Sequence, residues 1–154
     1  RALEASNVLV STKKIGNTFY KINAKNPQVW ALFAYVDYQR LNELPSPRRK
    51  AIIEFLEKIK QKPLIGVVFG STAKSTFTKE SDIDLLLVYN TKEKADIKLQ
   101  GEIEAVTGIN IQTFIIDYAY FKEQMMKQDD AVVTHAIKTG FAVSGFDLFY
   151  QEVL

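Results

Sequence analysis

The 154-residue sequence contains no cysteine and only one histidine. Without cysteine, the chain has no disulfide framework, no thiolate metal site and no thiol nucleophile. The single histidine, His135, falls in an expected helix with no other histidine or acid at metal-ligand spacing. We therefore expect His135 to pack against the core or to lie on the surface.

The sequence also lacks a long hydrophobic run. No run approaches the roughly 18 residues that a membrane span needs, and no signal peptide is visible. We therefore expect a cytoplasmic protein with no membrane contact. The chain begins at Arg1 rather than at methionine, which is typical of a fragment of a longer protein.

Charged residues are present in ordinary number but are unevenly distributed. Hydrophobic residues make up 47% of the chain and charged residues 25%, which is typical of one globular domain with a real core. Residues 1–50 hold nine Lys and Arg against three Asp and Glu, a balance of +6. Residues 51–154 hold eleven against fifteen, a balance of −4. This asymmetry indicates a basic, polyanion-facing part joined to an acidic part.

Residues 64–89 combine two hydrophobic runs with a polar loop. Residues 64–69 are apolar and predict a buried strand, which Gly70-Ser71 follows at once. Ten residues later, Asp82-Ile83-Asp84 leads into a second apolar run over residues 85–88. Two buried strands are therefore expected to carry a Gly-Ser turn and two acids at their connected ends.

The two acids predict a divalent metal site. Side chains at i and i+2 of a strand share a face, so Asp82 and Asp84 are expected as neighbours, with Cα atoms roughly 6–7 Å apart. Two carboxylates at the mouth of a buried strand are costly unless a cation compensates them. Mg²⁺ suits this position, because proteins usually hold it by one or two carboxylates plus substrate phosphates.

The Gly-Ser turn predicts a phosphate site beside that metal. Gly70 lets the backbone approach closely, the Ser71 hydroxyl can donate, and a helix that starts there aims free N–H groups at an anion. Lys74 adds a point charge, and Ser81 is placed to cap the loop or to position the metal site. Either motif alone is usually a simple turn or a solvated loop, but together they predict a metal–triphosphate site.

The spacing of these motifs resembles that of a known superfamily. Gly70-Ser71, ten residues, then Asp82-x-Asp84 is similar to the signature of the DNA polymerase beta-like nucleotidyltransferases, in their minimal branch. The resemblance implies transfer of a nucleoside monophosphate from an NTP with two Mg²⁺ ions. It implies catalytic and metal-binding roles for Asp82 and Asp84. The nucleotide-binding residues that it implies are Gly70, Ser71, Lys74 and Ser81.

The sequence departs from the family pattern at a third carboxylate. Members carry this acid on a later strand, and its place in this chain is near Gln112. The expected strand over residues 109–116 contains no acid, and Asp117 follows it facing the opposite side. An amide oxygen can contact a metal, but it brings no negative charge and cannot act as a base. A second departure is Lys74-Ser75, where many members have Arg-Gly.

The N-terminal 25 residues predict a basic β-hairpin. Residues 8–13 and 18–22 are β-prone, and Gly16-Asn17 is the turn signal between them. The pattern resembles the end of a winged-helix domain, which implies lysine contacts with a DNA backbone in a longer chain. A basic hairpin that is simply solvated is the alternative. The helix-turn-helix that such a domain needs is absent from this sequence.

The remaining segments predict strands that alternate with helices. We expect a connecting helix over residues 26–44 and a nucleotidyltransferase domain over residues 45–154. Helices are expected over residues 47–61, 92–107, 118–127, 130–138 and 146–154, and a short strand over residues 141–144. The expected fold is α/β, with a small mixed sheet of three or four strands and helices packed on it.

Two functions fit this pattern. The first is a Mg²⁺-dependent nucleotidyltransferase whose acceptor hydroxyl is not readable from the sequence. The resemblance allows a protein acceptor, such as a HEPN-type toxin, a small molecule or an RNA end. The alternative is a nucleotide-sensing, winged-helix transcription regulator with a degenerate catalytic site, and a plain interaction module is a third possibility.

Overall fold

Residues 1–154, described by a computed structural model, form a mixed sheet with the strand order β5-β4-β3-β6. The strands are β3 (Ile65–Phe69), β4 (Ile83–Tyr89), β5 (Ile111–Asp117) and β6 (Phe141–Ser144). Strand β3 lies antiparallel to both β4 and β6, whereas β4 and β5 are parallel. The expected α/β class and mixed sheet are thus confirmed, with four strands.

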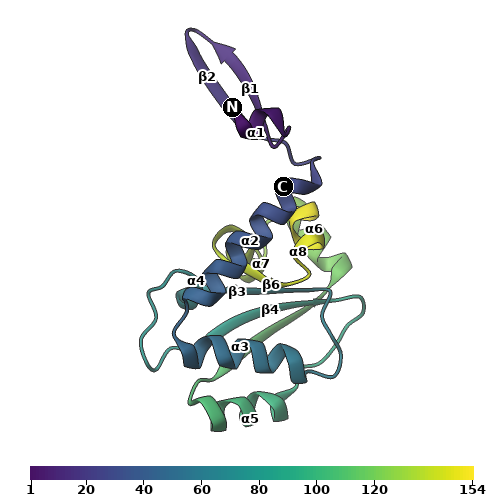
Figure 1. Ribbon diagram of the computed structural model, residues 1–154. Helices are drawn as coiled ribbons and strands as arrows, with labels where there is room; N and C mark the ends of the chain where they lie inside the picture. The colour runs from purple at the N-terminus through teal and green to yellow at the C-terminus, as the bar shows by residue number, and fades with distance from the viewer.

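Helices cover both faces of this sheet (Figure 1). Helices α3 (Ser46–Lys58) and α5 (Ile97–Thr107) lie on one face, below the sheet in Figure 1. The other face carries α2 (Pro27–Glu43), α6 (Tyr118–Lys127), α7 (Ala131–Thr139) and α8 (Phe146–Val153). Alternation along β4 separates the two cores, because Leu85 and Leu87 join the first and Leu86 and Val88 the second. No helix has both the length and the apolar character that crossing a membrane requires.

The start of α2 and the end of α5 agree with local sequence signals, whereas the start of α5 differs from the expected one. The Asn26 side chain accepts a hydrogen bond from Gln28 N at the start of α2, and Gly108 ends α5 with a left-handed φ of 71°. The sequence predicts that Thr91 caps a helix starting at Lys92, and this prediction for α5 is wrong. The helix starts at Ile97 instead, because Asp96 accepts a hydrogen bond from Leu99 N at 3.1 Å.

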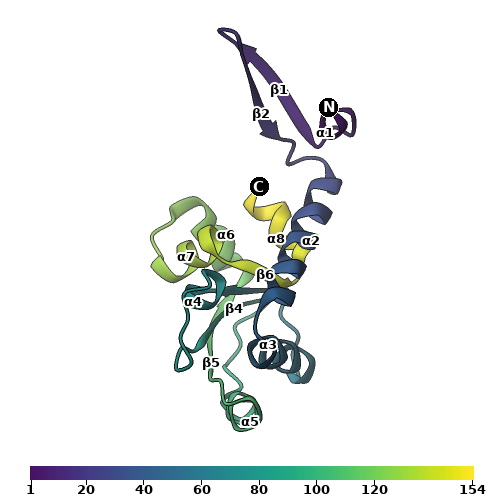
Figure 2. The same ribbon diagram turned by 60° about the vertical axis from the view of Figure 1, so that its left-hand side comes forward.

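The helical periodicity identified the buried faces only in part. On α2, the helical spacing of Leu32 and Val36 predicts that both are buried, but they are 46% and 53% exposed, whereas Asp37 is buried. The physical reason is that α2 contacts β6 and α8 along one side only, so apolar residues on its other side stay in solvent. Figure 2 shows α2 at the edge of the molecule.

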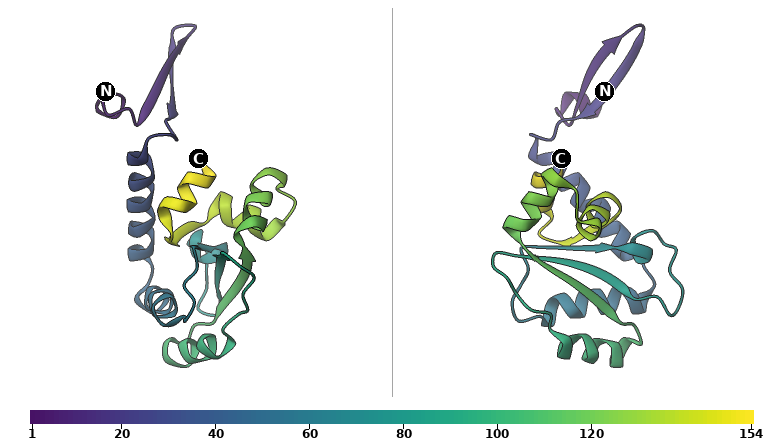
Figure 3. Two further views of the ribbon diagram at one scale, coloured as in Figure 1. Left: turned by 90° about the vertical axis from the view of Figure 1, so that its right-hand side faces the viewer. Right: turned by 180° about the vertical axis from the view of Figure 1, so that it is seen from behind.

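The predicted N-terminal hairpin is present and projects from the body (Figures 1 and 3). It consists of β1 (Leu9–Lys14) and β2 (Asn17–Ile22), after the short helix α1 (Ala2–Ala5). The turn is one residue earlier than expected, at Ile15-Gly16, and both residues have positive φ, as a two-residue hairpin turn requires. Its relation to a winged helix stays a prediction.

Gly101 lies inside α5 with nothing within 4 Å of the position that a Cβ atom would take. We expect Gly101→Ala to stabilise the fold by about 0.5–1 kcal/mol, because alanine restricts the unfolded chain and prefers the helix. Thermal unfolding would show this as a Tm rise of about 1–4 °C. Gly108→Ala is the matched control, and it should lower the Tm because that residue has a φ of 71°. Equal shifts in both variants would contradict the argument.

Candidate functional site

The Gly-Ser turn brings the backbone against one of the two acids. Strand β3 ends at Phe69, and Gly70 then starts the short helix α4 (Gly70–Ala73) with a φ of 67°. A Cβ atom built on Gly70 would lie 2.0 Å from Asp84 Oδ2. Only glycine therefore suits this position, both for its backbone conformation and for the close approach. The phosphate-cradle candidate and the metal-ligand candidate are in direct contact.

The two acids lie at the start of β4, on the face that α6 and α7 cover. Asp82 precedes the strand and is exposed, whereas Asp84 lies within it and is half-buried. Asp84 pairs with Phe69 of β3, which belongs to the core on that face. Burial, with the nearby charge of Asp82 as the second cause, raises the pKa of Asp84 above its ordinary value. The site therefore crowds negative charge in a partly desolvated position, where a cation is favourable.

Gln112 lies directly beside Asp84. The parallel register of β4 and β5 pairs Asp84 with Gln112, so their side chains leave the same face of the sheet. Asp117 is the last residue of β5, which corrects its expected place after the strand. It pairs with Tyr89 at the far end of β4, and its Oδ1 accepts a hydrogen bond from Tyr120 N at 2.8 Å as the cap of α6. Asp117 is thus not the missing acid.

Helix α2 holds the end of the Gly-Ser helix in place. Arg40 donates hydrogen bonds to the carbonyl oxygens of Ala73, at 3.1 Å, and of Gly140, at 2.9 Å. Asp37 accepts hydrogen bonds from Ala142 N, at 2.7 Å, and from the Tyr150 hydroxyl. Burial raises the pKa of Asp37 above its ordinary value, and these hydrogen bonds partly offset that rise. The helix between the hairpin and the sheet is therefore tied to α4, β6 and α8.

The loop between the turn and the acids is ordered around Ser81. Its Oγ accepts a hydrogen bond from Thr78 N at 2.9 Å and so caps the loop, whereas its role toward a metal or nucleotide stays a prediction. Lys74 follows α4 and is exposed, so its ammonium group is free to meet an anion. The positions of Gly70, Ser71 and the two acids agree with the site expected from the sequence, whereas their roles stay a prediction.

The helix dipole disfavours cations in the first turn of a helix, so the sequence predicts a solvated Arg48 at the start of α3, and this prediction is wrong. The residue is only 3% exposed, and its guanidinium group donates to the loop before Asp82. A sequence signal for its burial did exist. Arg48 continues the buried stripe of α3 that contains Ile52 and Phe55, at spacings of four and three residues.

His135 packs as expected, but its neighbours were not foreseen. Its ring lies edge-on to Phe69 with ring centroids 6.0 Å apart. Phe69 also pairs with Asp84 across β3 and β4, so His135 packs against a direct strand neighbour of this acid. No local spacing could indicate this contact, because it arises only from the packing of α7 on β3.

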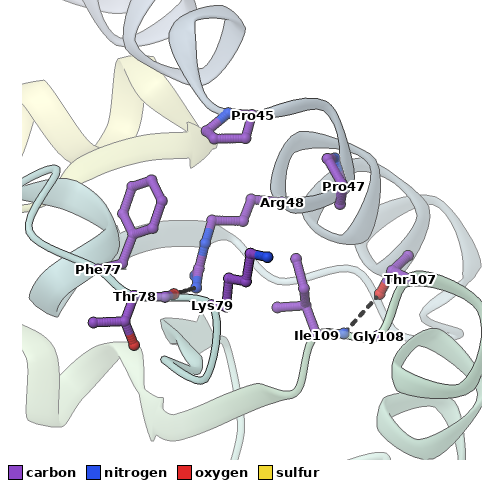
Figure 4. Close-up of a pocket in the computed structure, with 9 residues that line it drawn as sticks. All are labelled: Pro45, Pro47, Arg48, Phe77, Thr78, Lys79, Thr107, Gly108 and Ile109. Atoms are coloured by element: carbon purple, nitrogen blue, oxygen red, sulfur yellow. Dashed lines mark hydrogen bonds between the residues drawn. The ribbon is translucent and has the colours of Figure 1, made fainter.

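A cavity lies beside the loop between α4 and β4, away from the two acids (Figure 4). It has a volume of about 530 Å³, and its lining includes Pro45, Phe77 and Ile109 but none of the six residues predicted to form the site. Arg48 lines it from within, between the cavity and the loop that carries Asp82. We place the candidate site at the acids because the paired carboxylates and the Gly70 contact are there.

Comparison with protein families gives a match that covers the candidate site. The family described as "Polymerase beta, Nucleotidyltransferase" matches residues 50–137, which is more than half of the chain. The chain belongs to this family. The matched part of this polymerase beta-type nucleotidyltransferase domain contains the Gly-Ser turn, both acids, Gln112 and His135.

The comparison with solved structures gives a distant likeness. A chain from the "Crystal structure of the toxin-antitoxin with AMP-PNP" is 16% identical, with a TM-score of 0.44. The likeness covers 66% of this chain and 79% of that chain. A comparison with curated proteins found no match.

The residues present fit one Mg²⁺ ion better than two. Asp82 and Asp84 offer hard oxygen ligands, and the Gln112 amide oxygen adds a neutral one beside them. No group of three or more His, Asp or Glu side chains lies close enough to hold a metal ion. Substrate phosphates would therefore have to supply further ligands, and a second ion would lack the usual third carboxylate.

Asp84→Asn is expected to raise the stability of the metal-free nucleotidyltransferase domain. Because the folded state raises the pKa of Asp84, ionisation above that pKa costs folding free energy, and a neutral amide removes the cost. Thermal unfolding in EDTA at pH 7 should show a higher Tm for the variant. The difference should shrink as the pH falls below the ordinary aspartate range, where the wild-type carboxyl group is protonated in both states. A lower Tm for the variant at pH 7 would contradict this reasoning.

Proposed function

We propose that this chain is a Mg²⁺-dependent nucleotidyltransferase that moves a nucleoside monophosphate from an NTP to an acceptor hydroxyl. The observation that carries the proposal is the contact between Gly70 and Asp84, with a Cβ position only 2.0 Å from the Asp84 carboxylate. This contact supports a triphosphate bound at α4, with its phosphates next to the acids that would hold the metal. The family match over residues 50–137 supports the same reaction class.

The residues of the chain would bind and orient the NTP. Gly70 and Ser71 would hold the β- and γ-phosphates by backbone N–H groups and the Ser71 hydroxyl, and the exposed Lys74 would offset their charge. Asp82 and Asp84 would hold Mg²⁺, which when bound neutralises phosphate charge and favours in-line displacement. The acceptor oxygen forms a bond to the α-phosphorus, the bond to pyrophosphate breaks, and the hydroxyl proton leaves to solvent. Positioning supplies most of the rate gain.

The acceptor is proposed as a protein side chain, such as that of a HEPN-type toxin. This rests on the resemblance to minimal nucleotidyltransferases, which also allows a small molecule or an RNA end. Asp82 is exposed, which is compatible with a macromolecular acceptor at this position.

A labelling experiment tests the reaction. The protein is incubated with Mg²⁺, α-labelled or γ-labelled ATP and each class of acceptor, in parallel with an EDTA control. Transfer of the α label together with release of γ-labelled pyrophosphate establishes a nucleotidyltransferase. Transfer of the γ label instead would indicate a kinase and contradict the proposal.

A nucleotide-sensing regulator is the second candidate, because an amide lies beside Asp84 where the family carries an acid. Lys13, Lys14 and Lys21 of the hairpin are all exposed, and in this candidate they would contact a DNA backbone. This candidate predicts ATP binding by equilibrium dialysis without label transfer to any acceptor. Turnover that depends on Mg²⁺ would remove it.

A further inference from the structure

Arg48 connects α3 to the loop that ends at Asp82. Its Nη2 donates to the carbonyl oxygens of Thr78, at 2.9 Å, and of Ser81, at 2.6 Å. Its Nη1 donates to Thr72 Oγ1 at 2.9 Å and to the Asp82 carbonyl oxygen at 3.4 Å. Figure 4 shows the guanidinium group reaching Thr78 beneath Phe77. One side chain thus holds both ends of the segment between the Gly-Ser helix and the first acid.

These contacts fix the backbone of Asp82 and leave its carboxylate free. Arg48 forms no ion pair, because the partners of its Nη atoms are carbonyl and hydroxyl oxygens. The Thr72 hydroxyl, itself buried, also donates to the Asp82 carbonyl oxygen at 3.4 Å. A carboxylate whose oxygens are bonded to an arginine would be a poor metal ligand. Because Arg48 bonds to backbone and hydroxyl oxygens instead, the Asp82 carboxylate stays available for a metal ion.

The environment of Arg48 makes it hard to replace. The Phe77 ring packs over the guanidinium group, with its centroid 4.2 Å from the Cζ atom. Burial lowers the pKa of Arg48, and the charge of Asp82 partly offsets that change. A planar fork of N–H groups can serve four acceptors at once, whereas the single ammonium group of lysine has three donors in a different geometry.

We propose that Arg48 is a positioning residue for metal binding, which holds Asp82 at the distance from Asp84 and Gly70 that one divalent ion requires. The inference rests on the proposed function, because it takes Asp82 as a metal ligand. It extends that function to a residue outside the Gly-Ser and Asp-x-Asp motifs. Removing such a supporting contact typically costs 10–100-fold in metal affinity or activity.

Mn²⁺ binding without turnover provides the direct test. Free Mn²⁺ is measured by electron paramagnetic resonance during titration of the wild type, Arg48→Lys, Arg48→Met and Asp82→Ala. We expect about tenfold weaker Mn²⁺ binding for both Arg48 variants and loss of specific binding for Asp82→Ala. In a turnover assay, the Arg48 variants should need more Mg²⁺ for half-maximal rate and have a lower kcat, with a nearly unchanged KM for ATP at saturating Mg²⁺.

Arg49→Lys is the matched control. Arg49 is the next residue of α3 and donates only to the Asn42 carbonyl oxygen, at 2.9 Å, so Mn²⁺ affinity should equal that of the wild type. If Arg48→Met does not fold, Arg48→Lys carries the test. A lower Tm with wild-type Mn²⁺ affinity in Arg48→Lys would overturn the inference and leave Arg48 a purely structural role. If Asp82→Ala binds Mn²⁺ like the wild type, the metal site and the inference both fail.

Discussion

Asp82→Ala and Asp84→Ala are each expected to abolish Mg²⁺-dependent NTP turnover while leaving the fold intact. The two side chains leave the same face at the start of β4, and no third acid can take over metal binding. A bound metal supplies several kcal/mol of transition-state stabilisation, so the loss should be at least about 10³-fold in kcat. Pyrophosphate release with the α-labelled NTP measures it.

Asp117→Ala is the matched control for these variants. That acid caps α6 and pairs with Tyr89 at the other end of β4, so its loss should lower stability by about 1 kcal/mol and leave kcat unchanged. Circular dichroism and Tm establish that all three variants fold. Full turnover in either the Asp82 or the Asp84 variant would refute the assignment of the site.

Gly70→Ala is expected to remove nucleotidyl-transfer activity, whereas its effect on the free energy of unfolding is smaller than its effect on the reaction. A Cβ atom there would meet Asp84 Oδ2 at 2.0 Å, so the carboxylate must rotate away from its metal-binding position. Displacing a reacting group by about 1 Å can cost about 10²-fold in rate. The φ of 67° adds a backbone cost of about 1–2 kcal/mol for any residue with a side chain. Turnover and Tm are measured on the same preparation.

Gly101→Ala is the control that shows the effect of adding a methyl group at a glycine away from the site. That position is open, so its turnover should equal that of the wild type while its Tm rises. An active Gly70→Ala protein would show that the contact with Asp84 has no part in the reaction. A Gly70→Ala variant that is folded but inactive would support adjacent phosphate and metal sites.

The local patterns of the chain predicted more of the site than of the helices around it. The Gly-Ser turn and Asp-x-Asp lie at strand ends, and hydrophobic runs on each side mark those strands clearly. Helix faces were less certain, because α2 is apolar on most sides and packs on only one of them. The start of α5 was misplaced because Thr91 and Asp96 are both acceptable caps, and only the folded chain selects between them.

The sequence by itself determined the α/β class, the hairpin and the six residues expected to form the site, because each depends on contacts between residues close in the chain. Only the tertiary structure decided which distant groups meet them. It placed Gln112 beside Asp84 through the register of β4 and β5, and the His135 ring against Phe69 through the packing of α7 on β3. It also turned Arg48 from an expected surface cation into a buried support for Asp82. Such contacts depend on how whole elements pack, and a local pattern of residues contains no information on that packing.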